Sequence, residues 1–354
     1  MKDWRIFRAG VLQDLEGVPP HDGLTTLPAP PPWRRTSTTE SPAKPPRPPF
    51  DDFQAEALKG APIRLKDDPK DKDNVVRAIN AALYLRRPLL VTGKPGVGKS
   101  SLAYAVAYQL RMGPVLKWPI TSRATVKSGL YEYDAVGRLQ DIDKKDLGSY
   151  FRLGPLGTAL YPTTWPRVLL IDEIDKGDLD LPNDLLNVLE DGYFDIPELA
   201  RAKEQTVRVK MHGPAKADGS SPQVEIINGH VQSDQFPFIV MTSNGEREFP
   251  APFLRRCIRV TVPQPSLEDL QQIVKAHLTK HLTGVPTTSV DAMITTFIQQ
   301  REGQDIATDQ LLNAAYLVLG DGRSNDEQPE SPQANESLET FKLLVKQLTT
   351  TDAT

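Results

Sequence analysis

The chain of 354 residues is long enough for about two domains with tails. Apolar residues make up 39% and charged residues 25%, which is typical of a globular protein. The formal net charge of −4 excludes a global electrostatic attraction to nucleic acid, and residues 321–354, with three basic and seven acidic side chains, account for that charge by themselves.

Cysteine content and hydropathy indicate the cellular compartment of such a chain. Cys257 is the only cysteine, so an internal disulfide is impossible, and we expect a small buried side chain rather than a reactive thiol. The N-terminus lacks the apolar core of a signal sequence, and no run approaches about 18 apolar residues. We therefore expect a cytoplasmic protein without membrane insertion.

Residues 1–50 contain 11 of the 32 prolines, so this arm is expected to build no core and to be extended or disordered. Four large apolar side chains stand out in it. They could anchor the arm on its own domain, bind a partner, or have no role: Trp4, Ile6, Phe7 and Trp33.

The segment 51–262 alternates apolar runs with helical patterns, which predicts an α/β domain of three layers with a mainly parallel sheet. The polar stretch 121–166 is long for one connection, so we expect short helices and a functional surface there. Helices are predicted at 75–85 and at 185–190. Another helix is predicted to begin after Ser100 and to end at about residue 111. Strands are predicted at 89–91, 115–120, 167–171, 236–241 and 256–262, with an inserted hairpin formed by 207–211 and 224–227.

The stretch from Gly93 to Ser100 matches the phosphate-loop pattern G-x-x-x-x-G-K-[ST] in full. An apolar strand precedes it and a helical pattern follows, which argues against a simple glycine-rich turn. Such a loop turns backbone N–H groups toward phosphates, while Lys99 reaches the β/γ-phosphates and the Ser100 hydroxyl holds Mg²⁺. The predicted nucleotide-binding residues are Gly93, Lys94, Pro95, Gly96, Val97, Gly98, Lys99, Ser100 and Ser101.

An acidic pair, Asp172 and Glu173, ends the apolar run 168–171. Downstream of a complete phosphate loop, such an Asp completes Mg²⁺ coordination, and an adjacent Glu can activate the water that attacks the γ-phosphate. The pair could otherwise be an acidic turn, but its position after a buried strand favours catalysis.

Two further features follow the next strand. Asn244 could hold the attacking water at the end of strand 236–241, although Asn-Gly is by itself a turn signal. Arg255 and Arg256 end a proline-bounded segment, 249–256. They could be surface charges, or arginine fingers that act on the nucleotide of the next subunit in a ring.

Beyond Pro263 the composition changes. Three helical patterns at 267–282, 290–300 and 308–319 predict a small helical unit. Residues 321–336 read as an acidic linker. An apolar stripe on residues 338–348 then predicts a short helix that docks on this unit or on a neighbour, or that binds a partner.

Together these motifs resemble the AAA+ ATPases, and within them the MoxR-like branch. The resemblance rests on Gly93–Ser100, on the run 168–173 with the helix that follows, on Asn244 at the sensor-1 position and on the finger segment 253–256. It implies a P-loop NTPase domain of three layers with a five-stranded parallel sheet (51–262), followed by a small all-helical lid (263–320).

The resemblance also implies a function: ATP hydrolysis with Mg²⁺ in a homo-oligomeric ring, usually a hexamer, that remodels a protein client. MoxR-like members often act with a partner that carries an adhesion-type domain. The stretch 121–127 and the hairpin 207–231 could face the pore of the ring, or could be plain surface. The sequence departs from the family at the sensor-2 position, where 304–312 contain no Lys or Arg and Arg301 is the nearest base.

Two rival functions remain open at this point. A DNA- or RNA-acting motor is disfavoured because no region is strongly basic. An ATP-binding scaffold or switch with little turnover is favoured by the weak lid and opposed by Glu173 and the arginine pair.

Overall fold

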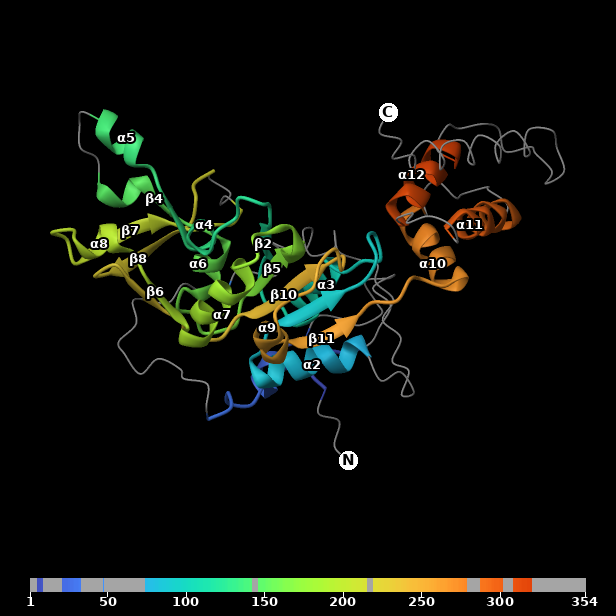
Figure 1. Cartoon of the computed structure of the whole chain (residues 1–354), viewed down its shortest axis with the longest axis horizontal. Helices are drawn as coiled ribbons and strands as arrows, with labels where there is room; N and C mark the ends of the chain where they lie inside the picture. The colour runs from blue at the N-terminus through green and yellow to red at the C-terminus, as the bar shows by residue number, and fades with distance from the viewer. Residues whose placement is uncertain are drawn as a thin grey trace.

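The computed structural model describes residues 5–8, 21–32, 47, 74–141, 146–214, 219–278, 287–301 and 308–319. Its centre is a five-stranded sheet in the order β11-β1-β10-β5-β2, in which every neighbouring pair is parallel (Figure 1). The predicted α/β domain with a five-stranded parallel sheet is thereby confirmed. The strands are β1 (Leu89–Thr92), β2 (Leu116–Pro119), β5 (Val168–Asp172), β10 (Phe238–Ser243) and β11 (Ile258–Thr261).

Side chains of the sheet alternate between two apolar cores, because successive residues of a strand point to opposite faces. One core takes Leu169 and Ile171 of β5, and the other takes Val168 and Leu170. Helices α2 (Val75–Leu85) and α3 (Ser101–Gln109) contribute to the second core. Helices α6 (Pro155–Leu160), α7 (Leu181–Asp191) and α9 (Ala251–Arg256) contribute to the first, which completes the three layers.

The boundaries of α2 agree with the prediction, and the caps explain why. The Asn74 side chain accepts hydrogen bonds from the N–H groups of Val76 and Arg77, which would otherwise lack partners at the start of the helix. At the other end, Arg86 adopts a left-handed conformation with φ of 51°, two residues before Pro88.

A second sheet of six short strands lies beside the central sheet, in the order β3-β4-β7-β8-β9-β6 (Figure 1). The predicted hairpin is present as the antiparallel pair β7 and β8. The sheet around it was not predicted, and the stretch 121–166 contains two of its strands besides the expected short helices α4 (Val126–Leu130) and α5 (Ala135–Gln140) and the 3-10 helix η3 (Leu147–Tyr150). The strands are β3 (Tyr131–Tyr133), β4 (Phe151–Leu153), β6 (Tyr193–Asp195), β7 (Thr206–Lys210), β8 (Gln223–Ile227) and β9 (His230–Gln232), with α8 (Pro197–Ala200) between β6 and β7.

The N-terminal arm contributes to the core of the domain, contrary to the expectation for residues 1–50. Ile6 and Phe7 are buried in the core that contains α2 and α3. Their backbone N–H groups donate to Oδ1 of Asn80, at 2.7 and 2.9 Å. Among the alternatives for the arm, anchoring on its own domain is therefore the one seen at these two residues. The segment also holds a 3-10 helix, η1 (Gly23–Thr26); Trp4 and Trp33 lie outside the described residues.

Three helices follow the sheet and pack around a core of their own, as the helical patterns predict. In Figure 1 they lie at the opposite end of the domain from the six-stranded sheet. They are α10 (Leu267–Leu278), α11 (Thr287–Arg301) and α12 (Thr308–Leu319). The predicted linker and helix after residue 320 lie outside the described residues. None of the described helices has the length and apolar character that crossing a membrane requires.

Candidate nucleotide-hydrolysis site

The loop between β1 and α3 has the geometry of a phosphate cradle. Three glycines in it have positive φ, namely Gly93 (151°), Gly96 (73°) and Gly98 (89°), which other residues rarely adopt. A Cβ on Gly93 would lie 2.7 Å from the carbonyl oxygen of Val262, so glycine is required there. The loop leads directly into the N-terminus of α3, where backbone N–H groups favour an anion.

Lys99 lies under this loop and is 7% exposed. Its Nζ donates to the carbonyl oxygens of Gly93 and Lys94, both at 2.8 Å, and to Oδ1 of Asn244 at 2.7 Å. Burial lowers the pKa of the Lys99 ammonium, while the nearby carboxylates oppose the shift. The lysine of the loop and the amide after β10, which are 145 residues apart in sequence, are thus in direct contact.

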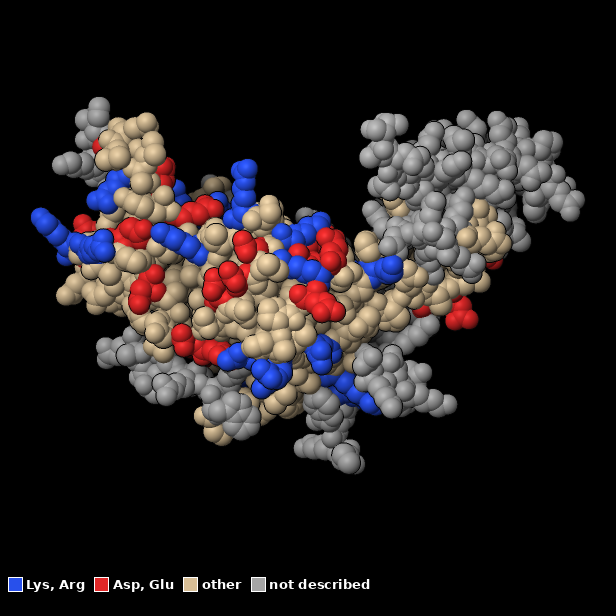
Figure 2. Space-filling view, in the orientation of Figure 1, with Lys and Arg blue, Asp and Glu red and all other residues tan. Residues whose placement is uncertain are grey.

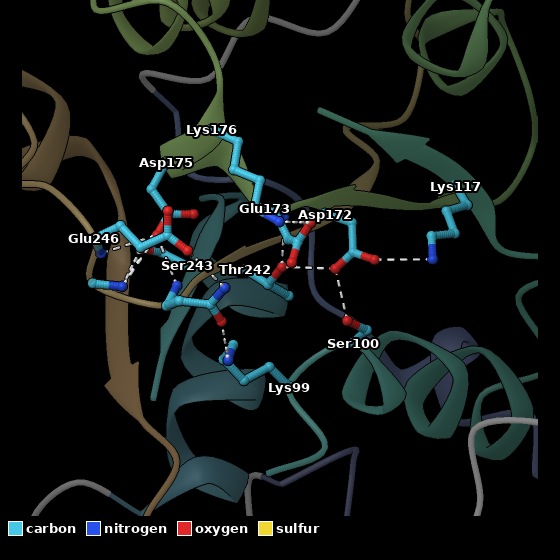
Figure 3. Close-up of polar contacts among 12 residues, drawn as sticks. Lys99, Ser100, Lys117, Asp172, Glu173, Asp175, Lys176, Thr242, Ser243 and Glu246 are labelled. Atoms are coloured by element: carbon cyan, nitrogen blue, oxygen red, sulfur yellow. Dashed lines mark hydrogen bonds and ion pairs between the residues drawn. The ribbon is translucent and has the colours of Figure 1, made fainter. Parts of the chain in front are cut away.

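Asp172 ends β5 and binds three side chains (Figure 3). Its Oδ1 accepts from the hydroxyls of Ser100 and Thr242, both at 2.7 Å, and its Oδ2 lies 2.9 Å from Nζ of Lys117. Burial by itself raises the pKa of the Asp172 carboxyl, but these three contacts outweigh it and hold the pKa below its ordinary value. The Ser100–Asp172 pair predicted as magnesium ligands is therefore preformed.

Glu173 follows in a left-handed conformation with φ of 58° and ψ of 51°. This backbone turn separates its side chain from that of Asp172. The Glu173 N–H donates to Oγ1 of Thr242 at 2.8 Å, and the carboxylate pairs with Nζ of Lys176 at 2.8 Å. Lys176 ends the 3-10 helix η4 (Ile174–Lys176) and holds the Glu173 carboxylate at the surface of the site.

Asn244 directly follows β10, and the carboxylate of Asp175 holds the loop that carries it. Oδ2 of Asp175 accepts from the backbone N–H groups of Asn244, Gly245 and Glu246 at 2.8, 3.1 and 3.2 Å, and from the Ser243 hydroxyl at 2.9 Å. Asp175 is 5% exposed. The sensor-1 position is thus fixed by a residue of η4, next to the acidic pair.

A pocket of about 330 Å³ brings these groups together. It lies at the C-terminal edge of the central sheet, where ligands of open α/β sheets bind. Its lining includes the predicted loop residues Pro95, Gly96, Gly98, Lys99, Ser100 and Ser101, and the predicted Asp172, Glu173 and Asn244, together with Thr242.

Comparison with known families identifies the domain. Residues 88–256 match the sequence profile of the family described as AAA domain (dynein-related subfamily). Residues 88–256 form an AAA domain. The predicted AAA+ P-loop ATPase domain is confirmed at this level. The match covers somewhat under half of the 354 residues.

Comparisons of the whole chain with known proteins give weaker similarities than the family profile does. A search of curated proteins gives no significant match. The chain is similar to NtrX from Brucella abortus in complex with ADP, with a TM-score of 0.42 and 15% identity over 84% of this chain and 66% of that chain. For NtrX in complex with ATP the TM-score is 0.41 and the identity 15%, over 83% of this chain and 65% of that chain. For the RuvB Holliday junction branch migration motor of Thermotoga maritima the TM-score is 0.42 and the identity 14%, over 77% of this chain and 69% of that chain. The chain thus spans just under two thirds of the two NtrX structures.

Arg255 and Arg256, the two predicted arginine fingers, lie apart from the pocket. Arg256 was expected to begin the last strand, but it ends helix α9, and β11 begins only at Ile258. The completely buried Phe253 anchors this helix on the core, which explains why the apolar segment coils before the strand begins. The Arg256 Nε pairs with Glu190 on α7, and neither Arg255 nor Arg256 is among the described residues that line the pocket.

Three residues of the site were missed from the sequence. Asp175 and Thr242 stand next to motif residues and could have been noticed as polar side chains at strand ends. Lys117 carries no sequence signal, since it reaches Asp172 only because β2 is the neighbour of β5. Arg301, the candidate sensor-2 base, is the last residue of α11, and residues 302–307 lie outside the described ranges.

The residues present fit a magnesium–nucleotide complex. Within the described ranges, no three His, Cys, Asp or Glu side chains come together as a metal site. Magnesium in nucleotide sites needs only one or two protein ligands, because phosphate and water oxygens complete its shell. The preformed pair of Ser100 and Asp172 beside the glycine cradle supplies that number.

Proposed function

We propose that this chain is a Mg²⁺-dependent ATP hydrolase of the AAA+ type. The observation that carries the proposal is the convergence of Lys99, Asp172 and Asn244 at the ends of three adjacent strands, around a pocket that opens on the glycine loop. Lys99 would bind the β/γ-phosphates, and Ser100 with Asp172 would hold Mg²⁺, which neutralises the phosphate charge when it is bound.

In this proposal Glu173 takes a proton from the attacking water and Asn244 orients that water. Since Arg255 and Arg256 do not line the pocket of their own chain, a neighbouring subunit would bring its α9 to the γ-phosphate. This requires a head-to-tail ring, and the resemblance to AAA+ proteins suggests a hexamer.

The finer role is a MoxR-like remodeller of a protein client, aided by a partner with an adhesion-type domain, in the cytoplasm. Support comes from the β7–β8 hairpin, which precedes Asn244 and is built into a sheet of its own. A Glu173→Gln chain loaded with ATP should hold the client, so a pull-down in ATP compared with ADP, followed by mass spectrometry, tests this role.

Phosphate release by the purified chain tests hydrolysis directly. Lys99→Ala should abolish nucleotide binding, and Glu173→Gln should keep binding and lose turnover by about two orders of magnitude or more. Lys210→Ala and Glu225→Gln, which alter exposed or half-exposed residues of the second sheet, are matched controls that should behave like the parent chain. Phosphate release unaffected by Glu173→Gln would contradict the proposal.

An ATP-binding switch with little turnover is the second candidate, favoured by the ion pair between Glu173 and Lys176. Lys176→Met would leave the Glu173 carboxylate without this partner. If the pair restrains hydrolysis, turnover should rise severalfold in Lys176→Met. If the pair breaks and re-forms freely, as expected of an active motor, turnover in Lys176→Met should change little.

A nucleic-acid motor is tested in the same assay by adding DNA or RNA. On the face shown in Figure 2, basic and acidic side chains are interspersed rather than gathered into one basic patch. We therefore expect no stimulation of phosphate release by either polymer.

A further inference from the structure

Lys117 stands between the nucleotide pocket and a second cavity. It is on β2, beside β5, and its ammonium lies 2.9 Å from Oδ2 of Asp172, the oxygen that the Ser100 and Thr242 hydroxyls leave to it. The Lys117 side chain is 48% exposed, so it can move, whereas that of Asp172 is 14% exposed and fixed. Lys117 therefore occupies one oxygen of the carboxylate expected to ligate magnesium.

The second cavity, of about 380 Å³, has Lys117 in its wall. We call it the β2 pocket; it lies between the end of β2, helix α4, strands β3 and β4, and the loop after β7. Its charged lining comprises three cations, Lys117, Arg123 and Arg152, and one carboxylate, Glu132. Because Lys117 is already paired with Asp172, the lining keeps an excess of one positive charge.

Unlike Lys117, the two arginines of this lining have no ion-pair partner among the described residues. The guanidinium groups of Arg123 and Arg152 make no hydrogen bond or ion pair with any described residue, and both side chains are exposed. His212 adds no charge at pH 7, because burial and the neighbouring Arg152 lower its pKa. Arginine forks at a pocket rim are suited to carboxylates, which they can bind through two parallel hydrogen bonds.

The rest of the lining indicates what carries the carboxylate. Apolar walls from Trp118, Pro119, Leu153 and Pro155 alternate with the charged groups. A nucleic-acid backbone offers anionic groups to the cations but no apolar side chain to these walls. A protein segment that carries both acidic and apolar side chains matches the cations and the apolar walls.

We propose that the β2 pocket binds acidic side chains of a client or partner protein, and that the bound carboxylate draws Lys117 away from Asp172. The pocket then couples partner binding to the magnesium site: Asp172 gains a free oxygen when the pocket is filled. Binding to the pocket stands by itself, whereas the coupling rests on the proposed ATPase function.

Binding is tested without nucleotide, by fluorescence anisotropy of a fluorescein-labelled hexaglutamate peptide. We expect Arg123→Gln and Arg152→Gln each to weaken binding about tenfold. Arg208→Gln, an exposed arginine of the same sheet outside the pocket, should not, and hexaglutamine should not bind. The pocket assignment is overturned if both pocket variants bind like the parent chain, or if a hexadeoxythymidine competes better than the peptide does.

Coupling is tested by the Mg²⁺ concentration that gives half-maximal binding of a fluorescent ATP analogue to the Glu173→Gln chain. Saturating hexaglutamate should lower this concentration severalfold. Adding Lys117→Met should lower it without peptide and remove the response. An unchanged Mg²⁺ requirement in Lys117→Met overturns the coupling. Failure of the analogue to bind at all would contradict the proposed function instead, and the peptide titration would still judge the pocket.

Discussion

Asp175 determines where Asn244 can be. Its Oδ2 accepts three consecutive backbone N–H groups, from Asn244 to Glu246, and this arrangement fixes the loop after β10 relative to the acidic pair. Asn244 in turn accepts from Lys99. One buried carboxylate therefore holds together the two strand ends on which the proposed water activation depends.

Replacing Asp175 should consequently affect turnover more than nucleotide affinity. In Asp175→Ala the buried donors lose their acceptor, which costs about 1–3 kcal/mol per unsatisfied group and lets the loop move. We expect phosphate release to fall at least about tenfold. Asp175→Asn keeps one acceptor oxygen and should recover part of the rate.

Steady-state kinetics together with equilibrium nucleotide titration separate the two effects. Asp178→Ala, which removes a nearby exposed carboxylate, is the matched control. Equal losses of affinity and rate in Asp175→Ala, with no recovery in Asp175→Asn, would show that Asp175 supports the fold of the site rather than the position of Asn244.

Cys257 gives a pH-dependent prediction. Burial raises the pKa of its thiol to about 12. The folded state then holds this proton to higher pH than the unfolded state, so the contribution to stability is present below an unfolded pKa of about 8.5 and is lost as pH rises toward 12. At pH 8 about one thiol in 10,000 is ionised in the folded chain.

Alkylation with iodoacetamide at pH 8, followed by mass spectrometry, measures this directly. The native chain should react orders of magnitude more slowly than the chain in guanidinium chloride. Similar rates in the two states would mean that Cys257 is accessible. The sequence predicted a small buried side chain rather than a reactive thiol at Cys257, and its 7% exposure agrees with that prediction.

Pocket residues that stand inside local motifs could be predicted to meet, and those that meet only through the fold could not. Lys99, Ser100, Asp172 and Asn244 were identified because each stands at a fixed place relative to a strand. Lys117 has no such mark: its contact with Asp172 depends on sheet order, which no local pattern encodes.

At the scale of elements, helix α2 depends on the N-terminal arm. The buried Asn80 of α2 accepts from the Ile6 and Phe7 N–H groups and donates through Nδ2 to the Phe7 carbonyl at 2.7 Å. The Asn80 side-chain amide thus provides the hydrogen-bond partners that a neighbouring strand or a helix would otherwise give to the backbone of Ile6 and Phe7. Phe7 itself is 2% exposed, so the arm completes the core over α2 and α3.

Loss of this docking should be visible in stability. Phe7→Ala should lower the free energy of unfolding by about 3–5 kcal/mol, and Asn80→Ala by about 2–4 kcal/mol, because it leaves buried backbone groups without partners. Denaturant unfolding followed by circular dichroism measures both. Arg8→Ala removes an exposed side chain and should stay within about 0.5 kcal/mol. A Phe7→Ala chain as stable as this control would contradict the docking.

Element prediction succeeded where a pattern was long and failed where pairing was remote. Helix α2 and strands β1, β5 and β10 have apolar runs or caps that identify them locally. Strands β3, β4, β6 and β9 have three residues each, too few for a period of two to be recognised. They become strands only because the β7–β8 hairpin offers two edges to pair with.

At the scale of the whole molecule, the decisive feature is the separation of α9 from the nucleotide pocket of the same chain. Arg256 pairs with Glu190, and the two side chains are 44% and 39% exposed. Such a surface ion pair contributes only about 0–1 kcal/mol, so a phosphate on a neighbouring subunit can compete for the arginine. In the proposed mechanism, the chain therefore supplies the phosphate loop, the base Glu173 and the Ser100–Asp172 pair, and a neighbouring subunit supplies the remaining cation.

This arrangement predicts complementation between two inactive chains. Arg256→Ala should bind nucleotide normally and lose turnover by about 10³-fold, as for a finger supplied in trans. Glu173→Gln should bind and also be inactive, but it keeps Arg256. In a mixed ring, the Arg256 of a Glu173→Gln subunit can serve the intact pocket of an Arg256→Ala neighbour, so mixing should restore phosphate release.

The mixing curve separates this mechanism from an effect within one chain. Activity should be greatest near equal amounts of the two chains, because that ratio maximises the number of productive neighbours. Arg255→Ala in place of Arg256→Ala decides which arginine is the finger, and Glu190→Gln, which removes only the resting partner of Arg256, should retain turnover. If no ratio exceeds the activity of the separate chains, while light scattering shows mixed rings, Arg256 does not act on the neighbouring nucleotide.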